Sequence, residues 1–351
     1  MLRLALASLA LLGTAIPLVR HDRWWIRVFD FPRMHIGAAA MAALVATVGR
    51  RRRAFSWPDA LLSTALGVAA VYQATRILPY TPLYPRQVKD ADPVRTRATL
   101  RLLVANVLMS NRQTEALLDL IRANDPDLVL TVETDSYWAD ALSALGADYP
   151  HVVSRPLDNT YGMILYSRRP LENPEVRFLI ESDIPSIHTH VTLDDGTRVR
   201  LYFLHPKPPY PKEDDATTDR DAELLLVGKD VAESGEIAVV AGDLNDVAWS
   251  YTTHLFQRIS RMLDPRIGRG MYNTFHAGLP LMRWPLDHVF HTEHFKLVRL
   301  ERLPSFGSDH FPIFIEIAVD DDAPAEQEEP RADAEDRELA NEKIDKARQS
   351  D

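Results

Sequence analysis

Residues 238–246 read Ala238-Val239-Val240-Ala241-Gly242-Asp243-Leu244-Asn245-Asp246, an apolar run that ends in a glycine and then in polar side chains. The apolar run predicts a buried β-strand, and strand periodicity places Asp243 and Asn245 on the same side of the chain. An aspartate offers a hard anionic oxygen that suits Mg²⁺ or orients a nucleophile, and an asparagine holds a phosphate oxygen without repelling it. The same residue types are common in turns, so this stretch alone is also consistent with a simple turn.

Five further segments also bring a polar side chain to an apolar strand. They are residues 102–106, 127–133, 199–206, 286–290 and 307–312. In order and spacing, the six pieces resemble the endonuclease/exonuclease/phosphatase (DNase-like) superfamily over roughly residues 99–319. Members of that superfamily include pancreatic-type DNases, AP endonucleases, inositol polyphosphate phosphatases and sphingomyelinases. The most specific pieces are Gly-Asp-x-Asn at 242–245 and Ser-Asp-His-x-Pro at 308–312.

The resemblance implies an α/β fold, namely a four-layer α/β/β/α sandwich with a cleft at one edge of its two sheets. The residue pattern agrees, because many short strand-like runs alternate with amphipathic segments at about 111–123, 136–145 and 218–232, which we predict to be helices. We therefore expect one catalytic domain at 99–319.

The resemblance also implies a divalent-cation site. Glu133 would hold Mg²⁺, with Mn²⁺ as the alternative ion, alongside Asn106, and Asp309 matches a residue near the metal. Carboxylate and amide oxygens are suitable ligands for a hard cation. The alternative for Glu133 is a strand-end carboxylate in solvent.

Five residues match catalytic or phosphate-binding positions of the family. Asp243 matches the residue that orients or deprotonates the attacking water, and Asn245 matches the phosphate-binding amide. His310 matches the histidine that contacts the phosphate, and Asp287 would hold its ring in one orientation. His205 ends a strand where lipid-phosphate and DNase-like members often carry histidine, and a strand-ending loop residue is the alternative. A carboxylate partner raises the pKa of a histidine, so we expect a cationic His310.

Together these residues predict a Mg²⁺-dependent phosphoesterase or phosphodiesterase that hydrolyses a phosphate ester by metal-assisted attack of water. The substrate class stays open between nucleic acid, a phospholipid head group and a small phosphodiester. Residues 99–319 lack a long basic stripe with interleaved aromatics, which a duplex-gripping nuclease would be expected to show. The alternative function is a non-catalytic, membrane-tethered binding module that retains the fold.

Three apolar segments precede the catalytic domain, at 4–19, 34–48 and 60–78. A bilayer core needs about 20 apolar residues as a helix, so the first two are short and the third is adequate. A cleavable signal peptide and a buried helical layer are the alternatives. Aromatic residues at the segment ends favour a membrane interface: Trp24, Trp25, Trp57, Tyr80 and Tyr84. We therefore predict a membrane anchor of three transmembrane helices at 1–78.

The run Arg50-Arg51-Arg52-Arg53 is the densest positive cluster in the chain. The positive-inside rule places it in the cytoplasm, and the catalytic domain on the opposite side of the membrane. In a bacterium this predicts a protein of the inner membrane whose catalytic domain lies in the periplasm. Nothing in the sequence indicates an obligate protein partner.

Two segments remain. Residues 79–98 contain four prolines and predict a semi-rigid linker. Residues 320–351 contain 13 acidic and 5 basic residues and carry −8 of the formal net charge of −10, so we predict an acidic disordered tail. The chain has no cysteine, which excludes disulfides and thiolate metal sites.

Overall fold

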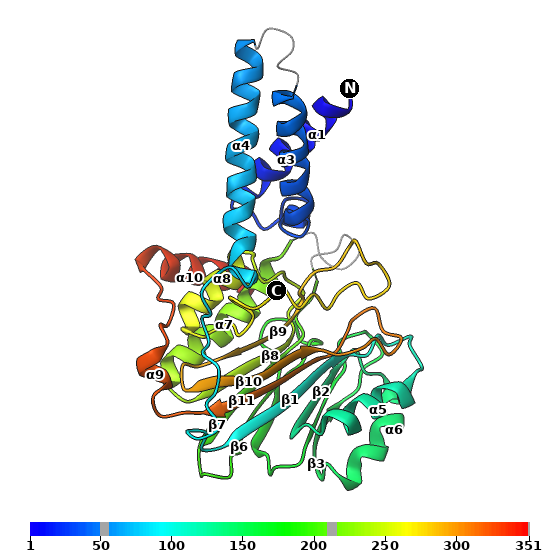
Figure 1. The fold of residues 1–351 in the computed structure, drawn as a ribbon. Helices are drawn as coiled ribbons and strands as arrows, with labels where there is room; N and C mark the ends of the chain where they lie inside the picture. The colour runs from blue at the N-terminus through cyan, green and yellow to red at the C-terminus, as the bar shows by residue number, and fades with distance from the viewer. Residues whose placement is uncertain (50–55, 209–215, 350–351) are drawn as a thin grey trace.

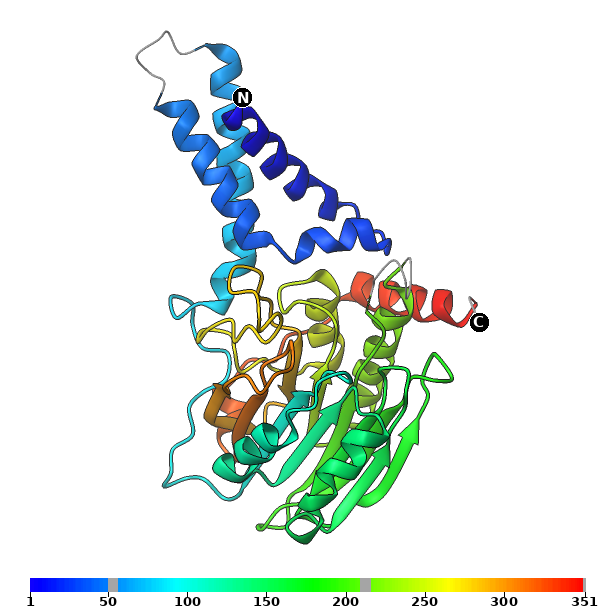
Figure 2. The ribbon, with the colours of Figure 1, turned by 90° about the vertical axis from the view of Figure 1, so that its right-hand side faces the viewer.

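Two β-sheets packed face to face form the body of the protein in a computed structural model that describes residues 1–49, 56–208 and 216–349 (Figures 1 and 2). Within these residues the first sheet has six strands, in the order β10-β11-β1-β2-β4-β3, and the second has five, in the order β5-β6-β7-β8-β9. The first sheet consists of β1 Thr99–Asn106, β2 Leu128–Val132, β3 His151–Arg155, β4 Met163–Ser167, β10 Phe295–Arg302 and β11 Ile313–Val319. The second sheet consists of β5 Glu172–Arg177, β6 Ser186–Thr192, β7 Arg198–Leu204, β8 Ala238–Asp243 and β9 Asp287–His291.

The core lies between the sheets, because alternate side chains of each strand point inward. Leu102, Val104 and Leu130 of the first sheet belong to one buried cluster with Phe203 and Val239 of the second. Helices cover the outer faces (Figure 1). They are α5 Thr114–Asn124 and α6 Ser136–Leu142 on the first sheet, and α7 Thr218–Ser234 and α8 Tyr251–Ser260 on the second. The structure thus has the layer order that we expected from the sequence.

The register brings the polar strand ends to one place. The parallel strands β1 and β2 pair Asn106 with Val132, and the parallel strands β7 and β8 pair Leu204 with Gly242. The antiparallel strand β9 begins opposite the end of β8, so that Asp287 faces Asp243. Parallel strands end at the same edge of their sheet, and a hydrogen bond from Asn106 of β1 to Asp243 of β8 joins these edges of the two sheets.

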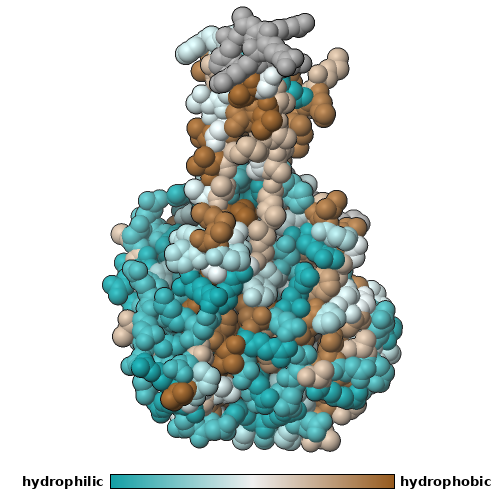
Figure 3. Space-filling view, in the orientation of Figure 1, coloured by the Kyte–Doolittle hydropathy of each residue, from teal (hydrophilic) through white to brown (hydrophobic). Residues whose placement is uncertain are grey.

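The N-terminal helices form a stem that projects from the body (Figures 1 and 2). The helices of this region are α1 Leu2–Ala15, α2 Trp24–Arg27, α3 Arg33–Val48 and α4 Trp57–Ile77. We call α1, α3 and α4 the stem; they pack through small side chains such as Ala10, Ala40, Ala43 and Ala69. Figure 3 shows apolar side chains over the stem and a mostly hydrophilic body below it.

The prediction of three membrane-spanning helices is not supported. In the described part of the chain, one helix, Trp57–Tyr80, is long and apolar enough to cross a bilayer. A second candidate is the pair Trp24–Asp30 and Arg33–Val48, which is bent by 70°. The helix Leu2–Leu18 is too short, because a span needs about 20 residues. Arg50–Arg53, on which the predicted orientation depends, lie outside the described residues.

The prediction of a semi-rigid linker at residues 79–98 is corrected, because this segment lies against the body. The Gln87 N–H donates to the Ile267 carbonyl at 3.4 Å, and Leu297 of β10 exchanges backbone hydrogen bonds with Lys89 and Ala91, both at 2.8 Å. Val88 is fully buried in the core between the sheets. Backbone hydrogen bonds and one apolar side chain therefore hold this segment against the body.

The prediction of a disordered tail is wrong. Residues 320–349 include α9 Ala323–Glu326 and α10 Ala334–Arg348. A capping box between Asp333 and Asp336 begins α10, and Ala340 and Ile344 pack against α7 and α8. Lys343, on the same face of α10, forms ion pairs with Asp22 and Asp221. Small apolar residues at helical spacing and buried ion pairs are enough to dock a segment whose composition is mostly charged.

Candidate active site

A cavity of about 390 Å³ lies where the polar strand ends of the two sheets meet. Six of the residues predicted from the sequence line it: Glu133, His205, Asp243, Asn245, Asp309 and His310. Asn106 and Asp287 are buried beside the cavity and reach it through hydrogen bonds to the lining residues. The structure therefore brings all eight predicted residues together.

Unusual backbone conformations at the strand ends orient these side chains towards the cavity. Gly242 has φ 146°, and a Cβ at this position would lie 1.9 Å from the Leu204 carbonyl oxygen, so no other residue fits between β7 and β8 here. Two non-glycine residues in the loops that follow β2 and β8 have a left-handed backbone conformation. They are Glu133 (φ 60°) and Asn245 (φ 51°). Such conformations are costly for residues with a Cβ and are concentrated at functional sites.

Asn106 connects the two sheets at the cavity floor. Its Nδ2 donates to Glu133 Oε1 at 2.7 Å and to Asp243 Oδ2 at 3.0 Å, and its Oδ1 accepts from the Leu108 N–H at 2.9 Å. The amide thus holds two carboxylates from different sheets close together. In this arrangement Asn106 is a donor between the carboxylates, whereas its predicted role as a cation ligand requires its oxygen.

His310 lies between two carboxylates. Its Nδ1 is 2.8 Å from Asp287 Oδ2, and its Nε2 is 3.5 Å from Asp243 Oδ2. Burial would lower the pKa of His310, but the charges of Asp287 and Asp243 outweigh burial and raise it to about 10. The ring is therefore an imidazolium at neutral pH, as expected from the sequence. Asp243, Asp287 and His310 are close enough for a metal site, but a protonated imidazole has no lone pair for a cation.

In the part of the chain that the structure describes, neutral N–H donors, and not lysine or arginine, hold the carboxylates of Glu133 and Asp243 at the cavity. Burial raises the pKa of Glu133 to about 7 and also raises the pKa of Asp243. Asp309 Oδ1 is buried and has no hydrogen-bond partner among the described residues. A bound cation stabilises carboxylates that are buried close together without other positive charges beside them. Glu133 and Asp309 thus fit a hard divalent cation such as Mg²⁺ or Mn²⁺, which prefers oxygen ligands.

His205 has a different electrostatic environment from His310. Burial lowers the pKa of His205 to about 4, so this ring is neutral at pH 7. Its Nε2 is 3.9 Å from Asp243 Oδ2, and its ring centroid is 5.6 Å from that of Tyr161. A neutral imidazole can exchange a proton or accept a hydrogen bond. The two histidines of the cavity therefore supply one cation and one neutral group.

The sequence did not identify the apolar part of the lining. Val28 and Phe31 come from the segment between α1 and α3, and Tyr161, Phe275 and Leu286 come from loops of the body. No local pattern marks these residues, because only tertiary contacts bring them to the site. Arg220 and Asp221, near the start of α7, do not line the cavity and are buried and paired with each other at 2.8 Å.

Comparison with known proteins agrees with this geometry. The model of the Endonuclease/Exonuclease/phosphatase family matches residues 103–310, more than half of the chain. None of the curated proteins compared with the chain matches it.

Solved structures share the fold at low sequence identity. The endonuclease/exonuclease/phosphatase from Beutenbergia cavernae is 19% identical with a TM-score of 0.52, over 64% of this chain and 72% of its own. The human Nocturnin catalytic domain with bound sulfate is 16% identical with a TM-score of 0.53, over 67% of this chain and 97% of its own. D. rerio TDP2 complexed with single strand DNA product is 15% identical with a TM-score of 0.51, over 63% of this chain and 99% of its own.

At such identities the likeness to solved structures shows the fold alone, whereas the family match also covers the strand ends that carry the site. The family match agrees with a site of paired carboxylates and an imidazolium that is suited to hydrolysis of phosphate ester bonds. The chain belongs to the endonuclease/exonuclease/phosphatase family.

Proposed function

We propose that this protein is a membrane-anchored, Mg²⁺-dependent phosphoesterase that hydrolyses a phosphate ester by attack of water. The observation that carries the proposal is the arrangement of Asp243 next to the His310 imidazolium, at a cavity where Glu133 and Asp309 lack a matching cation. A module that only binds has no need for a raised carboxylate pKa beside a fixed imidazolium.

Each residue of the site has a role in this reaction. Asp243, whose pKa burial raises, accepts a proton from water more readily than an exposed aspartate does. The water oxygen forms a bond to phosphorus as the ester P–O bond breaks. The departing alkoxide takes up a proton from solvent to become an alcohol, Asp243 returns its proton to solvent, and the phosphate keeps one ester bond fewer. His310 stabilises negative charge on the phosphoryl oxygens, and Asn245 holds one of them.

Four further residues support this arrangement. Asp287 fixes the ring of His310 through Nδ1. Bound near Glu133 and Asp309, Mg²⁺ would neutralise the charge of the phosphate, and Mn²⁺ offers the same oxygen chemistry. Asn106 spaces the carboxylates for such an ion.

We also propose that the stem attaches the protein to the inner membrane, with the catalytic domain on the periplasmic side. Support comes from apolar side chains that point outward from the stem, such as Leu9, Met41, Val45, Val68 and Val71. A reporter that is active only in the periplasm should work when it is fused after Tyr84. An inactive reporter after Tyr84 together with an active one after Arg53 would reverse the orientation.

The proposed activity is tested with the full-length protein in detergent. We expect hydrolysis of bis-p-nitrophenyl phosphate that requires Mg²⁺ or Mn²⁺ and stops on addition of EDTA. Parallel assays with single-stranded DNA, RNA and phospholipid vesicles show which class of substrate the protein hydrolyses. Binding of one of these ligands without hydrolysis at any Mg²⁺ concentration would favour the non-catalytic module instead.

A further inference from the structure

One wall of the catalytic cavity is apolar, and part of it comes from the segment that leads into the stem. Val28 and Phe31 line the cavity together with Phe275 and Leu286. Val28 is 45% exposed, so its side chain is available to a bound molecule. The carboxylates and His310 form the polar part of the same cavity. The cavity therefore has a polar half and an apolar half.

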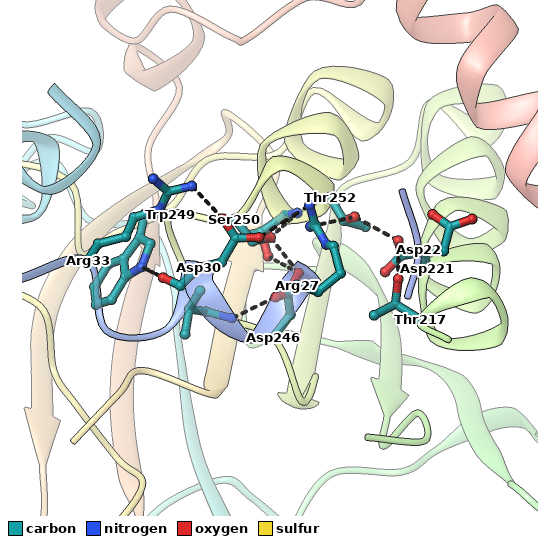
Figure 4. Close-up of polar contacts among 12 residues, drawn as sticks. Asp22, Arg27, Asp30, Arg33, Thr217, Asp221, Asp246, Trp249, Ser250 and Thr252 are labelled. Atoms are coloured by element: carbon teal, nitrogen blue, oxygen red, sulfur yellow. Dashed lines mark hydrogen bonds and ion pairs between the residues drawn. The ribbon is translucent and has the colours of Figure 1, made fainter. Parts of the chain in front are cut away.

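Buried hydrogen bonds and ion pairs fix this wall to the catalytic loop (Figure 4). The Trp249 indole N–H donates to the Asp30 carbonyl oxygen at 2.7 Å, and Trp249 lies six residues after Asp243. Arg27, next to Val28, forms an ion pair with Asp30 at 3.2 Å and contacts Thr252 of α8. These contacts are made by the residues directly before Val28 and directly before Phe31. The apolar wall is thus held at a fixed position relative to the catalytic residues.

The apolar surface continues from the cavity towards the stem. Helix α3 begins at Arg33, two residues after Phe31. The loop at 276–284 carries Leu279, Leu281 and Met282, which are 50%, 82% and 48% exposed. The imidazole of His35, in α3, contacts the Leu281 carbonyl oxygen at 2.7 Å, which holds this loop against the base of the stem. Exposed apolar residues clustered beside apolar helices are typical of a surface that meets lipid.

From this arrangement we propose that the substrate is an amphiphilic phosphate ester of the membrane that holds the stem. Its phosphate occupies the polar half of the cavity, and the apolar chain next to the phosphate packs on Val28 and Phe31. A water-soluble phosphate ester would leave this wall without a partner, whereas an amphiphile matches both halves of the cavity. This inference rests on the proposed hydrolysis of phosphate esters and adds the substrate class.

The test compares two synthetic diesters with the same leaving group, p-nitrophenyl ethyl phosphate and p-nitrophenyl dodecyl phosphate. Both are assayed with the full-length protein in mixed detergent micelles with Mg²⁺. Burial of a few methylene groups on the apolar wall should raise kcat/KM for the dodecyl ester by about 30-fold over the ethyl ester. Equal values for the two esters, or faster cleavage of single-stranded DNA than of the dodecyl ester, would overturn the inference.

Variants at Val28 assign the preference to the wall. Val28→Ser should reduce the dodecyl-to-ethyl ratio about 5-fold or more, and Val28→Leu should preserve the ratio because it keeps the apolar surface. Val152→Ser is the matched control, since Val152 is 44% exposed on β3 and does not line the cavity. An unchanged ratio in Val28→Ser would contradict the assignment. Hydrolysis of both esters at equal rates rejects the inference alone, whereas hydrolysis of neither rejects the proposed function as well.

Discussion

Two clusters of buried charge lie on either side of the loop that follows β8, and they differ in how their charges are matched. In the cluster beneath the stem, Asp221 is 2.8 Å from Arg220 and 2.9 Å from Lys343. At the catalytic cavity, Glu133 and Asp243 share the single amide of Asn106. We call the first the paired cluster and the second the catalytic cluster. Figure 4 shows part of the paired cluster.

The pKa values shift in opposite directions in the two clusters. Burial opposes the charged form of Asp221, but Lys343 and Arg220 outweigh it and lower the pKa of this carboxyl group well below its usual range. At the catalytic cavity burial prevails and raises the pKa of Asp243. Both aspartates are almost fully buried. Burial alone therefore does not distinguish a structural aspartate from a catalytic one, whereas the match of opposite charges does.

The largest expected effect is on turnover in the catalytic cluster. His310→Ala should lower kcat by about 10²–10⁴-fold, because it removes the imidazolium that faces the phosphate. Asp287→Ala should cause part of that loss through a misoriented ring. The double variant should be little worse than His310→Ala alone, since residues that act as a unit are not additive.

Steady-state kinetics on bis-p-nitrophenyl phosphate measure these losses. His190→Gln is the control, because His190 pairs with Glu236 and does not line the cavity. Losses that multiply in the double variant would show that Asp287 does not act through His310.

The next effect concerns the cation. Glu133→Gln keeps the size of the side chain but removes its negative charge, so the Mg²⁺ concentration for half-maximal activity should rise about 10-fold or more. A Mg²⁺ titration of activity, after removal of metal with EDTA, measures the shift. Glu115→Gln, an exposed substitution on α5, should leave the titration unchanged. An unchanged Mg²⁺ requirement in Glu133→Gln would exclude Glu133 from the cation site.

Substitutions in the paired cluster should lower the stability of the protein and leave its turnover unchanged. Lys343→Met leaves Asp22 and Asp221 with fewer cations in a buried site, which costs about 3 kcal/mol and lowers Tm by roughly 5–10 °C. Lys346→Met is the matched control, because Lys346 also pairs with Asp22 but its side chain is 52% exposed. Calorimetry of both variants measures the difference. Equal Tm values would show that α10 does not dock through Lys343.

The smallest effect is a pH-dependent gain in stability. Burial, reinforced by Glu181 and Asp219, raises the pKa of Glu223 on α7 to about 8. Folding therefore takes up a proton at Glu223 between about pH 4.5 and pH 8, and stability falls as pH rises through this window. Glu223→Gln removes this loss, so its gain in Tm should grow from about pH 5 to pH 8. Glu233→Gln, exposed on the same helix, should show no such trend.

The sequence predicted the strand ends well, because the information there is local. Apolar runs that end in Asn106, Glu133 and Asp243 identify both the strands and the polar side chains that follow them. The amphipathic pattern of residues 111–123 likewise predicted α5, whose buried face carries Leu117, Leu118 and Ile121. Local patterns of this kind are formed by residues that are neighbours in the chain.

The remaining features depend on contacts between distant segments. Val28 reaches the cavity through tertiary contacts of its segment, such as the hydrogen bond between Asp30 and Trp249, more than 200 residues away. Composition suggested that the tail is disordered. In the structure, however, Ile344 packs against α7, and Lys343 forms ion pairs with Asp221 of α7 and with Asp22, just before α2. Composition does not reveal such contacts. The number of membrane spans was overestimated, because short apolar segments resemble spans by composition but not by length.

The distinction between the two clusters is tested most directly by one paired measurement, of kcat and Tm in Asp243→Asn and Asp221→Asn. Both substitutions keep the size of a buried aspartate and remove its charge. We predict that Asp243→Asn lowers kcat by about 10²-fold or more with an equal or higher Tm, because the cost of burying the Asp243 charge outweighs its pairing with His310. Asp221→Asn should keep kcat and lower Tm, because Arg220 and Lys343 lose their partner. Wild-type turnover in Asp243→Asn, or a Tm loss in it as large as in Asp221→Asn, would contradict the assignment of Asp243 to catalysis.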